Sequence, residues 1–394
     1  MRSNDFDIVI AGGGMVGACC AIALSKRGFR IAVVEASTFK PDTVTADQAF
    51  DLRVSAVSPR SQEILESLGI WQQLLPDRVC PYEKMFVWHQ NGSASVALDA
   101  VELARQQLGS IVENRVLQQA FANACHQSEL IQWFQPDHIE ALSENSETGV
   151  ALELASGRHL RSQLLIAADG RGSPTREMAQ IETQNGQYQQ TAFVANVTTE
   201  LPHQSTAWQR FLSTGPLAFL PLSNGQSSIV WSCDDSFAET LKPLSTHDFC
   251  HSLEVAFEGK LGQITGCSER LSFPLGWHHC DQWVNNRVLL VGDAAHSVHP
   301  LAGQGVNLGF SDVELLFQLL DNSSKPIQAS RLRRYERQRK SETWLATQSF
   351  SGLKWFFGME QKSVASIRDI GMRVVSRNPF LRRGLMRRAI ENLT

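Results

Sequence analysis

Residues 8–35 read IVIAGGGMVGACCAIALSKRGFRIAVVE, and this stretch decides the fold. A short apolar run at 8–11 leads into a cluster of glycines, and a second apolar run at 31–34 ends at Glu35. Between the two runs, small and apolar residues form the pattern of a closely packed helix. The stretch therefore predicts a β-α-β unit built around the pattern G-x-G-x-x-G.

The glycines of this unit have separate expected tasks. Gly12 permits a tight turn, Gly14 lets the backbone approach a pyrophosphate, and Gly17 lets the helix pack closely on the strand. The amino end of the helix offers free N–H groups and a positive dipole end to the phosphates. Glu35 can accept hydrogen bonds from an adenosine ribose, and an acid here argues against a ribose 2′-phosphate. The sequence thus predicts a bound dinucleotide, FAD or NAD.

Length and composition indicate a globular protein with two closely joined domains. The chain has 394 residues, of which 43% are hydrophobic and 19% are charged. No apolar run approaches the roughly 20 residues that a membrane span needs. The first strand begins too early to leave room for a signal peptide. The eight cysteines show neither C-x-x-C nor zinc spacing, so we expect reduced thiols in a cytoplasmic protein.

A second motif follows the buried strand that we expect at 164–168. Residues 169–176 read DGRGSPTR, which is the pattern D-G-x-x-S-x-x-R. One interpretation is structural: an Asp-Gly turn closes the strand and Ser173 caps a helix. The motif by itself does not decide between this interpretation and a role in the cofactor site.

A third motif lies at 288–309, where the sequence reads VLLVGDAAHSVHPLAGQGVNLG. A strand delivers Asp293 to its carboxyl end, where open α/β sheets bind ligands. The Gly-rich loop that follows can press exposed amide donors against a flat anionic ring. A carboxylate beside that loop suits the hydroxyls of a ribityl chain. These features favour a flavin.

Taken in order, the three motifs resemble those of the class A, single-component flavoprotein aromatic hydroxylases, over roughly residues 5–345. Within that family, the stretches DLRVSAV at 51–57, VEN at 112–114 and RRYERQRK at 333–340 are similar to the hydroxylases of ubiquinone biosynthesis. The resemblance implies an α/β fold with a Rossmann-like FAD-binding domain of the p-hydroxybenzoate hydroxylase type. It also implies an inserted antiparallel β-sheet substrate domain and a C-terminal helical extension.

The implied domains alternate along the chain. We expect the FAD-binding domain at 1–75, 109–182 and 275–330, the substrate domain at 76–108 and 183–274, and basic C-terminal helices at 331–394.

The resemblance also implies which residues hold FAD. Glycines of the first motif would hold the pyrophosphate, with Asp169 near it, Glu35 on the ribose and Asp293 on ribityl and phosphate oxygens. Asn114 departs from the family, because many relatives carry an arginine there. The implied cofactor-binding residues are Gly12, Gly14, Met15, Val16, Gly17, Glu35, Arg53, Asn114, Asp169, Gly292, Asp293, Gly303, Gly305, Val306 and Asn307.

The implied catalytic residues are Pro300, Gly303 and Gln304. In the family, reduced flavin reacts with O₂ to give a C4a-hydroperoxide, whose distal oxygen an electron-rich phenol attacks. The protein must then exclude water, orient the ring and stabilise the peroxide with backbone N–H groups near 303–305. We expect His296 to be a packing residue. We expect no metal site either, because the neighbours His278 and His279 would point to opposite faces of a strand.

The expected function is hydroxylation of a polyprenylated phenol in ubiquinone biosynthesis, with O₂ as co-substrate. There is no second G-x-G-x-x-G unit, so NAD(P)H binds transiently or another donor reduces the flavin. Two alternatives stay open: a non-catalytic, FAD-holding scaffold of a membrane-associated biosynthetic assembly, or a hydroxylase of a small aromatic compound. We expect Phe219 and Trp231 to line or support a substrate cavity rather than to stack on nucleic acid.

The C-terminal segment is strongly basic. Residues 331–394 contain 15 Lys and Arg against 5 Asp and Glu, a local charge of +10. One interpretation is a solvated face that balances an acidic body. The other is contact with a membrane surface or with other ubiquinone-synthesis proteins, because apolar and basic groups can segregate on these helices. That interpretation would place the protein peripherally at the inner membrane.

Overall fold

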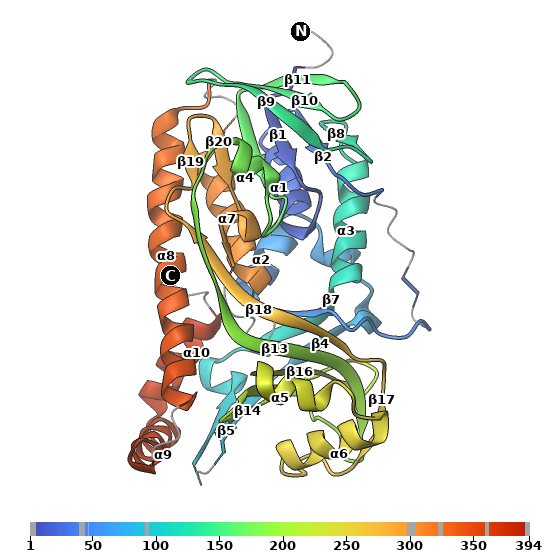
Figure 1. The fold of residues 1–394 in the computed structure, drawn as a ribbon, viewed down its shortest axis with the longest axis vertical. Coiled ribbons are helices and arrows are strands. Elements are labelled where there is room, and N and C mark those ends of the chain that lie inside the picture. Colours follow the sequence, from blue (N-terminus) through green and yellow to red (C-terminus); the bar gives the residue numbers. More distant parts are fainter. Residues whose placement is uncertain are drawn as a thin grey trace.

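The computed structural model describes residues 5–38, 44–45, 47–90, 94–297, 305–321, 326–358 and 362–390, without the side chains of 346–347, 349–358, 362–368 and 388–390. Two parts are stacked along the long axis, a helix-covered α/β part and a sheet-rich part, with the C-terminal helices along one side (Figure 1). Two long strands, β13 (Thr183–Thr199) and β18 (Leu271–Cys280), run between the two parts.

The α/β part is built on a six-stranded sheet. Its strands in spatial order are β19 (Val284–Asn285), β20 (Val288–Leu290), β12 (Leu164–Ala167), β1 (Ile8–Ala11), β2 (Ile31–Val34) and β8 (Ile131–Phe134). All neighbours pair in parallel except β19, which lies antiparallel at the edge. The three central strands are buried along their whole length, as expected for short, continuous apolar runs in a parallel sheet.

Helices of the α/β part pack closely on this sheet. Helix α1 (Met15–Lys26) contacts both α3 (Asn114–His126) and α7 (Gly305–Leu319). A Cβ atom on Gly309 would lie 2.5 Å from Cγ2 of Val16, so glycine is what allows α7 to approach α1 this closely. Helix α2 (Pro59–Ser67) contacts α7, and a small sheet of β9 (Ile139–Asn145), β10 (Val150–Leu154) and β11 (His159–Ser162) adds leucines to the same core.

A second small sheet joins the two parts. It consists of β3 (Val54–Val57), β7 (Gly109–Glu113) and β4 (Val79–Tyr82), all antiparallel. Buried residues of these strands share a core with the large sheet below, through Ala56, Ile111 and Leu220. The two short helices η1 (Trp71–Gln73) and η2 (Pro76–Arg78) lead into β4.

The lower part is a nine-stranded sheet. Its remaining strands are β5 (Lys84–His89), β6 (Ser95–Asp99), β14 (Thr206–Leu212), β15 (Gly215–Pro221), β16 (Ser227–Asp234), β17 (Ile264–Cys267) and β21 (His296–Ser297). All pairings are antiparallel except that of β14 with β5. Helices α5 (Asp235–Leu241) and α6 (Thr246–Ala256) cover one face, and Phe219 and Trp231 are buried in the core beneath them. These two aromatics therefore support the sheet from its helix-covered side.

Three helices end the chain: α8 (Ala329–Gly358), α9 (Lys362–Arg377) and α10 (Pro379–Ile390). The beginning of α8 packs on the six-stranded sheet, where the Tyr335 hydroxyl donates to the carbonyl of Leu290 at 2.9 Å. Within the described ranges, none of the helices has the length and hydropathy to cross a membrane. The expected fold class, with its inserted sheet and C-terminal helices, is confirmed.

Candidate dinucleotide and active site

The three glycines of the G-x-G-x-x-G pattern differ, because Gly12 and Gly17 are closely packed and Gly14 faces open space. Gly12 has a φ of +95°, and a Cβ there would lie 2.5 Å from the carbonyl oxygen of Ala168. A Cβ on Gly17 would lie 2.0 Å from the carbonyl oxygen of Gly12. A Cβ on Gly14 would meet no atom of the described structure within 4 Å, and no side chain caps α1. The amino end of α1 therefore keeps both space and N–H donors for a phosphate.

Glu35 fastens the glycine loop to the end of β2. Its Oε2 accepts a hydrogen bond from the Gly13 amide at 2.7 Å, and its Oε1 accepts from the amide of Ser37 at 2.9 Å. A carboxylate has further acceptor positions, so these bonds orient Glu35 without exhausting it. A Cβ on Gly13 would lie 2.4 Å from the ring of Trp133, which places this half-buried indole beside the expected ribose site. Trp133 could not be predicted from the sequence, because only the order of the strands brings β8 next to β2.

The second motif is first of all a helix cap. The Ser173 side chain accepts from the Arg176 amide at 3.0 Å at the start of α4 (Pro174–Met178). Asp169 accepts from the Ser173 hydroxyl and from the Thr175 amide. The structural interpretation of this motif is thus confirmed, and Asp169 stays an expected cofactor ligand at the carboxyl end of β12.

Arg176 connects the second motif with the third. Its guanidinium is buried and donates to the carbonyl of Ala294 at 3.0 Å and to that of Arg171 at 3.1 Å. The sequence pattern D-G-x-x-S-x-x-R includes this arginine but does not indicate its role. The arginine was visible in the sequence, but its partner lies 118 residues away.

The third motif turns sharply after β20. Gly292 has a φ of +56° and begins the short helix η4 (Gly292–Ala294). A Cβ on it would lie 3.2 Å from Val16, so the first and third motifs touch. Solvent reaches the side chain of Asp293, yet protein surrounds it on most sides. This desolvation raises the pKa of Asp293, and the positive charges of His296 and Arg171 oppose the shift.

Beneath this turn lies a buried ionic cluster, which we call the Asp312 cluster: Asp312, His296 and Arg339. Asp312 accepts from His296 Nε2 at 2.9 Å, from Arg339 Nε at 2.7 Å and from the Gly292 amide at 2.8 Å. Burial alone would raise the pKa of Asp312, but the charges of His296 and Arg339 outweigh it, so the pKa is lowered. Burial alone would lower the pKa of Arg339, but the charge of Asp312 and its hydrogen bond outweigh this, so the pKa is raised. The cluster holds the turn that carries Asp293 and ties it to α7 and α8.

The beginning of α7 is anchored to the small joining sheet. Asn307 donates through Nδ2 to the carbonyl of Ala56 at 2.8 Å and accepts from the amide of Ser58 at 3.0 Å. Gly305 and Val306 open the helix. The predicted catalytic residues, and Gly303 as a cofactor ligand, lie outside the described residues: Pro300, Gly303 and Gln304.

Arg53 and Asn114 are brought together at the edge of the same sheet. The Asn114 amide donates to the carbonyl of Arg53 at 3.0 Å, and its Oδ1 accepts from the Ser55 hydroxyl at 2.7 Å. The Arg53 side chain is exposed. The neighbouring Arg115 donates to Glu113 at 2.9 Å. Arg115 therefore does not take the place of the arginine that many relatives carry at position 114.

Glu113 organises a buried network that sequence reasoning missed. It accepts from Arg78 at 3.1 Å and from the Asp51 amide at 2.7 Å. Arg78 in turn donates to the carbonyls of Thr45 and Gln48. The network holds the chain just before Arg53 in place.

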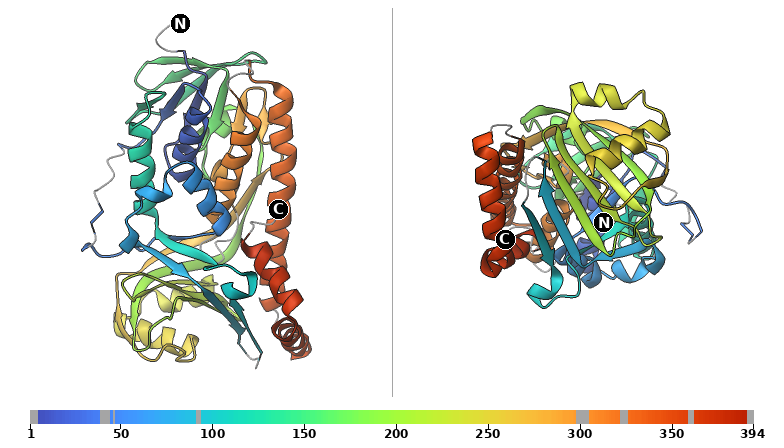
Figure 2. Two further views of the ribbon diagram at one scale, coloured as in Figure 1. Left: turned by 180° about the vertical axis from the view of Figure 1, so that it is seen from behind. Right: turned by 90° about the horizontal axis from the view of Figure 1, so that it is seen from below.

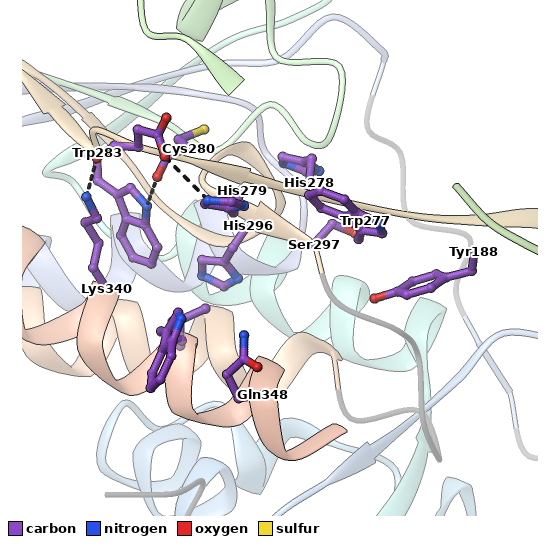
Figure 3. A pocket seen from close by; sticks show the side chains of 13 residues that line it. Tyr188, Trp277, His278, His279, Cys280, Trp283, His296, Ser297, Lys340 and Gln348 are labelled. Carbon is purple, nitrogen blue, oxygen red and sulfur yellow. Dashed lines mark hydrogen bonds and ion pairs between the residues drawn. The ribbon is translucent and has the colours of Figure 1, made fainter. Parts of the chain in front are cut away.

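A cavity of about 420 Å³ lies between β18, β21 and α8 (Figure 3). Its walls are rich in aromatic rings and include Tyr188, Trp277, Trp283, Trp344, His278, His279, His296 and Lys340. His278 is 3% exposed, and neither ring nitrogen makes a well-aligned hydrogen bond within the described structure, although the backbone of Asp293 lies nearby. Burial, with Arg176 nearby, lowers its pKa to about 4. In the described part of the chain, no three His, Cys, Asp or Glu residues are grouped to hold a metal ion.

The sequence of the chain matches the model of a known protein family. Residues 5–349 match the model of the FAD binding domain family. The chain belongs to this family. It is 33% identical to the 3-demethoxyubiquinol 3-hydroxylase of Escherichia coli K12, over 99% of this chain and 100% of that protein. It is 32% identical to the mitochondrial ubiquinone biosynthesis monooxygenase COQ6 of Danio rerio, over 97% of this chain and 89% of that protein.

Solved structures confirm the fold. The p-nitrophenol 4-monooxygenase PnpA of Pseudomonas putida DLL-E4 superposes with a TM-score of 0.79 at 16% identity, covering 99% of this chain and 98% of that chain. The family model and the two relatives together place the chain among the class A FAD-dependent monooxygenases, in the ubiquinone-biosynthesis hydroxylase group.

The geometry fits FAD at this site. The open space at Gly14, the uncapped α1 and the acceptors Glu35 and Asp293 supply what a dinucleotide with a polyol chain needs. When bound, FAD supplies the redox chemistry with O₂.

Proposed function

We propose that this enzyme hydroxylates the aromatic ring of a polyprenylated phenol in ubiquinone biosynthesis. The observation that carries the proposal is that the three motifs meet at one site. The chain that brings them together is about one-third identical, over nearly its whole length, to enzymes named for hydroxylation in that biosynthesis. Contacts join the motifs directly, from Val16 to Gly292 and from Arg176 to Ala294.

In this proposal the residues of the chain bind, orient and exclude water. Backbone N–H groups at Gly14 to Val16 hold the pyrophosphate, Glu35 the ribose and Asp293 the ribityl hydroxyls. Arg53 would approach the pyrophosphate or the flavin ring, and Pro300 with residues 303–307 would line the ring. The Asp312 cluster fixes the turn on which Asp293 stands, which makes His296 a positioning residue.

The aromatic cavity favours an apolar substrate over a small acid. Ser297, which belongs to the third motif, is part of its wall, together with three tryptophans. An isoprenoid chain suits the tryptophan side chains of these walls. The alternative of a small aromatic substrate has no comparable observation in its favour.

O₂ is the second substrate, and a reduced nicotinamide or another donor binds transiently to reduce the flavin. We place contacts with other ubiquinone-synthesis proteins or with a membrane on the C-terminal helices. A non-catalytic, FAD-holding scaffold would need the same cofactor geometry, so assays of flavin reduction and oxygen uptake coupled to a product separate it from the enzyme.

Two variants test the cofactor part of the proposal. Gly14→Val fills the open space over α1, so we expect a folded but colourless protein. Gly384→Val is its control, because a Cβ there also meets nothing within 4 Å in the described structure, far from the site. Asp293→Ala should bind FAD roughly 10- to 100-fold more weakly, since a hydrogen bond to a charged group is lost.

Deletion of the gene tests the reaction. We expect a polyprenylated intermediate lacking one ring hydroxyl to accumulate, and mass spectrometry of the quinone lipids identifies it and its ring position. Unchanged quinone lipids in the deletion strain would contradict the proposal, as would restoration by the Gly14→Val variant.

A further inference from the structure

The end of the chain exposes a dense group of apolar side chains, which we call the C-terminal patch. It consists of five residues on α9 and α10: Ile370 (61% exposed), Val374 (48%), Phe380 (82%), Leu381 (46%) and Leu385 (49%). Thirteen large hydrophobic side chains are exposed in the described part of the molecule, and five of them lie within these 16 residues. Scattered exposed hydrophobics are ordinary, but a contiguous group marks an interaction surface.

Both helices are fixed to the body by their other faces. Met372 and Met386 are 6% and 1% exposed and pack into the body. Asp369 Oδ1 lies 2.9 Å from Nε2 of the buried His89, and Arg382 donates to Glu102 at 2.7 Å. The exposure of the patch is therefore built into the fold rather than caused by a helix that has come away from it.

The positions on each helix keep the two faces apart. Ile370 and Val374 lie one turn apart on α9, while Met372 is on the opposite side. Leu381 and Leu385 are likewise one turn apart on α10. In both views of Figure 2, α9 and α10 lie at the margin of the molecule beside the lower sheet.

Basic side chains surround the patch. Residues 379–390 contain four arginines and no acid. An open groove of about 620 Å³ runs along α9, with Ile370, Val374 and Phe380 beside Arg373 and Arg377. Apolar side chains next to guanidinium groups suit an interface where hydrocarbon meets anionic phosphates, because arginine stems lie on apolar surface while their heads reach the charged layer.

We propose that the C-terminal patch docks the enzyme on the surface of an anionic phospholipid bilayer. This inference rests on the proposed function, since a polyprenylated phenol is dissolved in the membrane. The side chains would enter only the headgroup boundary, in keeping with helices that lie on a bilayer. The positive charge of α10 matches the negative charge of such a surface, whereas the rest of the chain is acidic.

Co-sedimentation of the FAD-loaded, full-length protein with vesicles tests the proposal. Vesicles of phosphatidylglycerol and phosphatidylcholine should bind the protein at low ionic strength, and vesicles of phosphatidylcholine alone should bind it far less. Arg377→Gln with Arg383→Gln should weaken binding roughly 25-fold, about fivefold for each charge removed. Phe380→Ser with Leu381→Ser should weaken binding to a similar extent.

Matched controls use exposed residues elsewhere. Arg333→Gln with Arg334→Gln removes the same charge from α8, and Leu201→Ser with Val255→Ser removes comparable apolar surface from the lower part. These controls should bind like the wild type. FAD absorbance, measured in every variant, stays unchanged and separates this proposal from the assignment of the cofactor site.

Three results would overturn the proposal. The first is that wild-type protein ignores anionic vesicles at low ionic strength. The second is that the controls weaken binding as much as the patch variants do. The third is that the patch variants leave vesicle binding intact but turn an oligomer into a monomer in sedimentation, because the patch would then be covered by a second copy of the chain.

Discussion

The two ends of the basic C-terminal segment use arginine in opposite ways. At the beginning of α8, Arg339 is 2% exposed and paired with Asp312. On α10, Arg383 and Arg387 are exposed and stand beside apolar side chains that are exposed as well. One composition, with a charge of +10 over 64 residues, therefore covers an interior structural role and an outward-facing surface. The exposure of each arginine distinguishes the interior role from the surface role, whereas the net charge of the segment does not.

The largest effect on stability is expected when an arginine of this segment is replaced by methionine in the interior rather than on the surface. Arg339→Met leaves Asp312 in the interior without its guanidinium, which should lower the free energy of unfolding by about 3–5 kcal/mol. The variant should also lose FAD, because the turn that carries Asp293 loosens. Urea unfolding and flavin absorbance measure both effects.

Arg383→Met is the matched control, because the same atoms change on an exposed helix face. It should alter the free energy of unfolding by no more than about 0.5 kcal/mol. Equal losses in the two variants would break the distinction between interior and surface arginines.

A pH experiment compares the paired Arg339 with an unpaired interior base. His278 has a folded-state pKa of about 4, below its ordinary 6.5. As the pH falls below about 6.5, the unfolded chain takes up a proton that the folded protein cannot hold until about pH 4. Stability should therefore fall across this window, by up to about 3 kcal/mol.

The His278→Gln variant should lack this component of the pH dependence, as seen in urea unfolding at pH 7 and pH 5. His279→Gln changes the exposed neighbour on the same strand and should behave like the wild type. A pH dependence that is identical in the wild type and in His278→Gln would show that His278 is not held neutral.

A smaller effect is expected where α9 meets the body. Asp369→Ala removes the carboxylate that faces the buried His89 and should cost about 1–2 kcal/mol of unfolding free energy. FAD content should not change, because the site lies in the other part of the molecule. Glu239→Ala, which breaks the exposed pair with Lys242, should be nearly neutral in the same unfolding measurement.

The smallest effect is expected at the contact of α10 with η3 (Ala100–Leu103). Arg382 and Glu102 form a partly exposed pair, with side chains 21% exposed each. Such pairs contribute less than about 1 kcal/mol, and salt weakens them. Arg382→Gln should lower the unfolding midpoint slightly at low salt and hardly at all at high salt. A large loss at high salt would mean that the helix is held mainly by this residue.

Local pattern sufficed for much of the fold. The β-α-β unit at 8–35 could be predicted because its glycines and apolar runs act on their immediate neighbours. The two apolar runs of that unit are β1 and β2, and the helix expected between them is α1. The capping role of Ser173 also follows from residues within one turn.

Long-range pairing could not be predicted in the same way. Arg176 meets Ala294 across 118 residues, and Asp312 meets Arg339 across 27. No spacing rule links such residues, because strand order and helix packing bring them together. The side of the sheet to which Trp231 points could not be predicted for another reason. Both faces of β16 are largely buried, so its pattern of apolar residues cannot say which face lies under α5 and α6.

Oxygen uptake coupled to product formation is the decisive test of whether the enzyme hydroxylates a polyprenylated phenol. The FAD-loaded protein, with a reductant, is given a phenol with a short prenyl chain and, in parallel, the same phenol without the chain. We expect the prenylated phenol to gain one oxygen atom on its ring for each O₂ consumed, while the unprenylated phenol reacts poorly. Tight coupling with the unprenylated phenol alone, or a flavin that reacts with O₂ without hydroxylating either compound, would contradict this expectation.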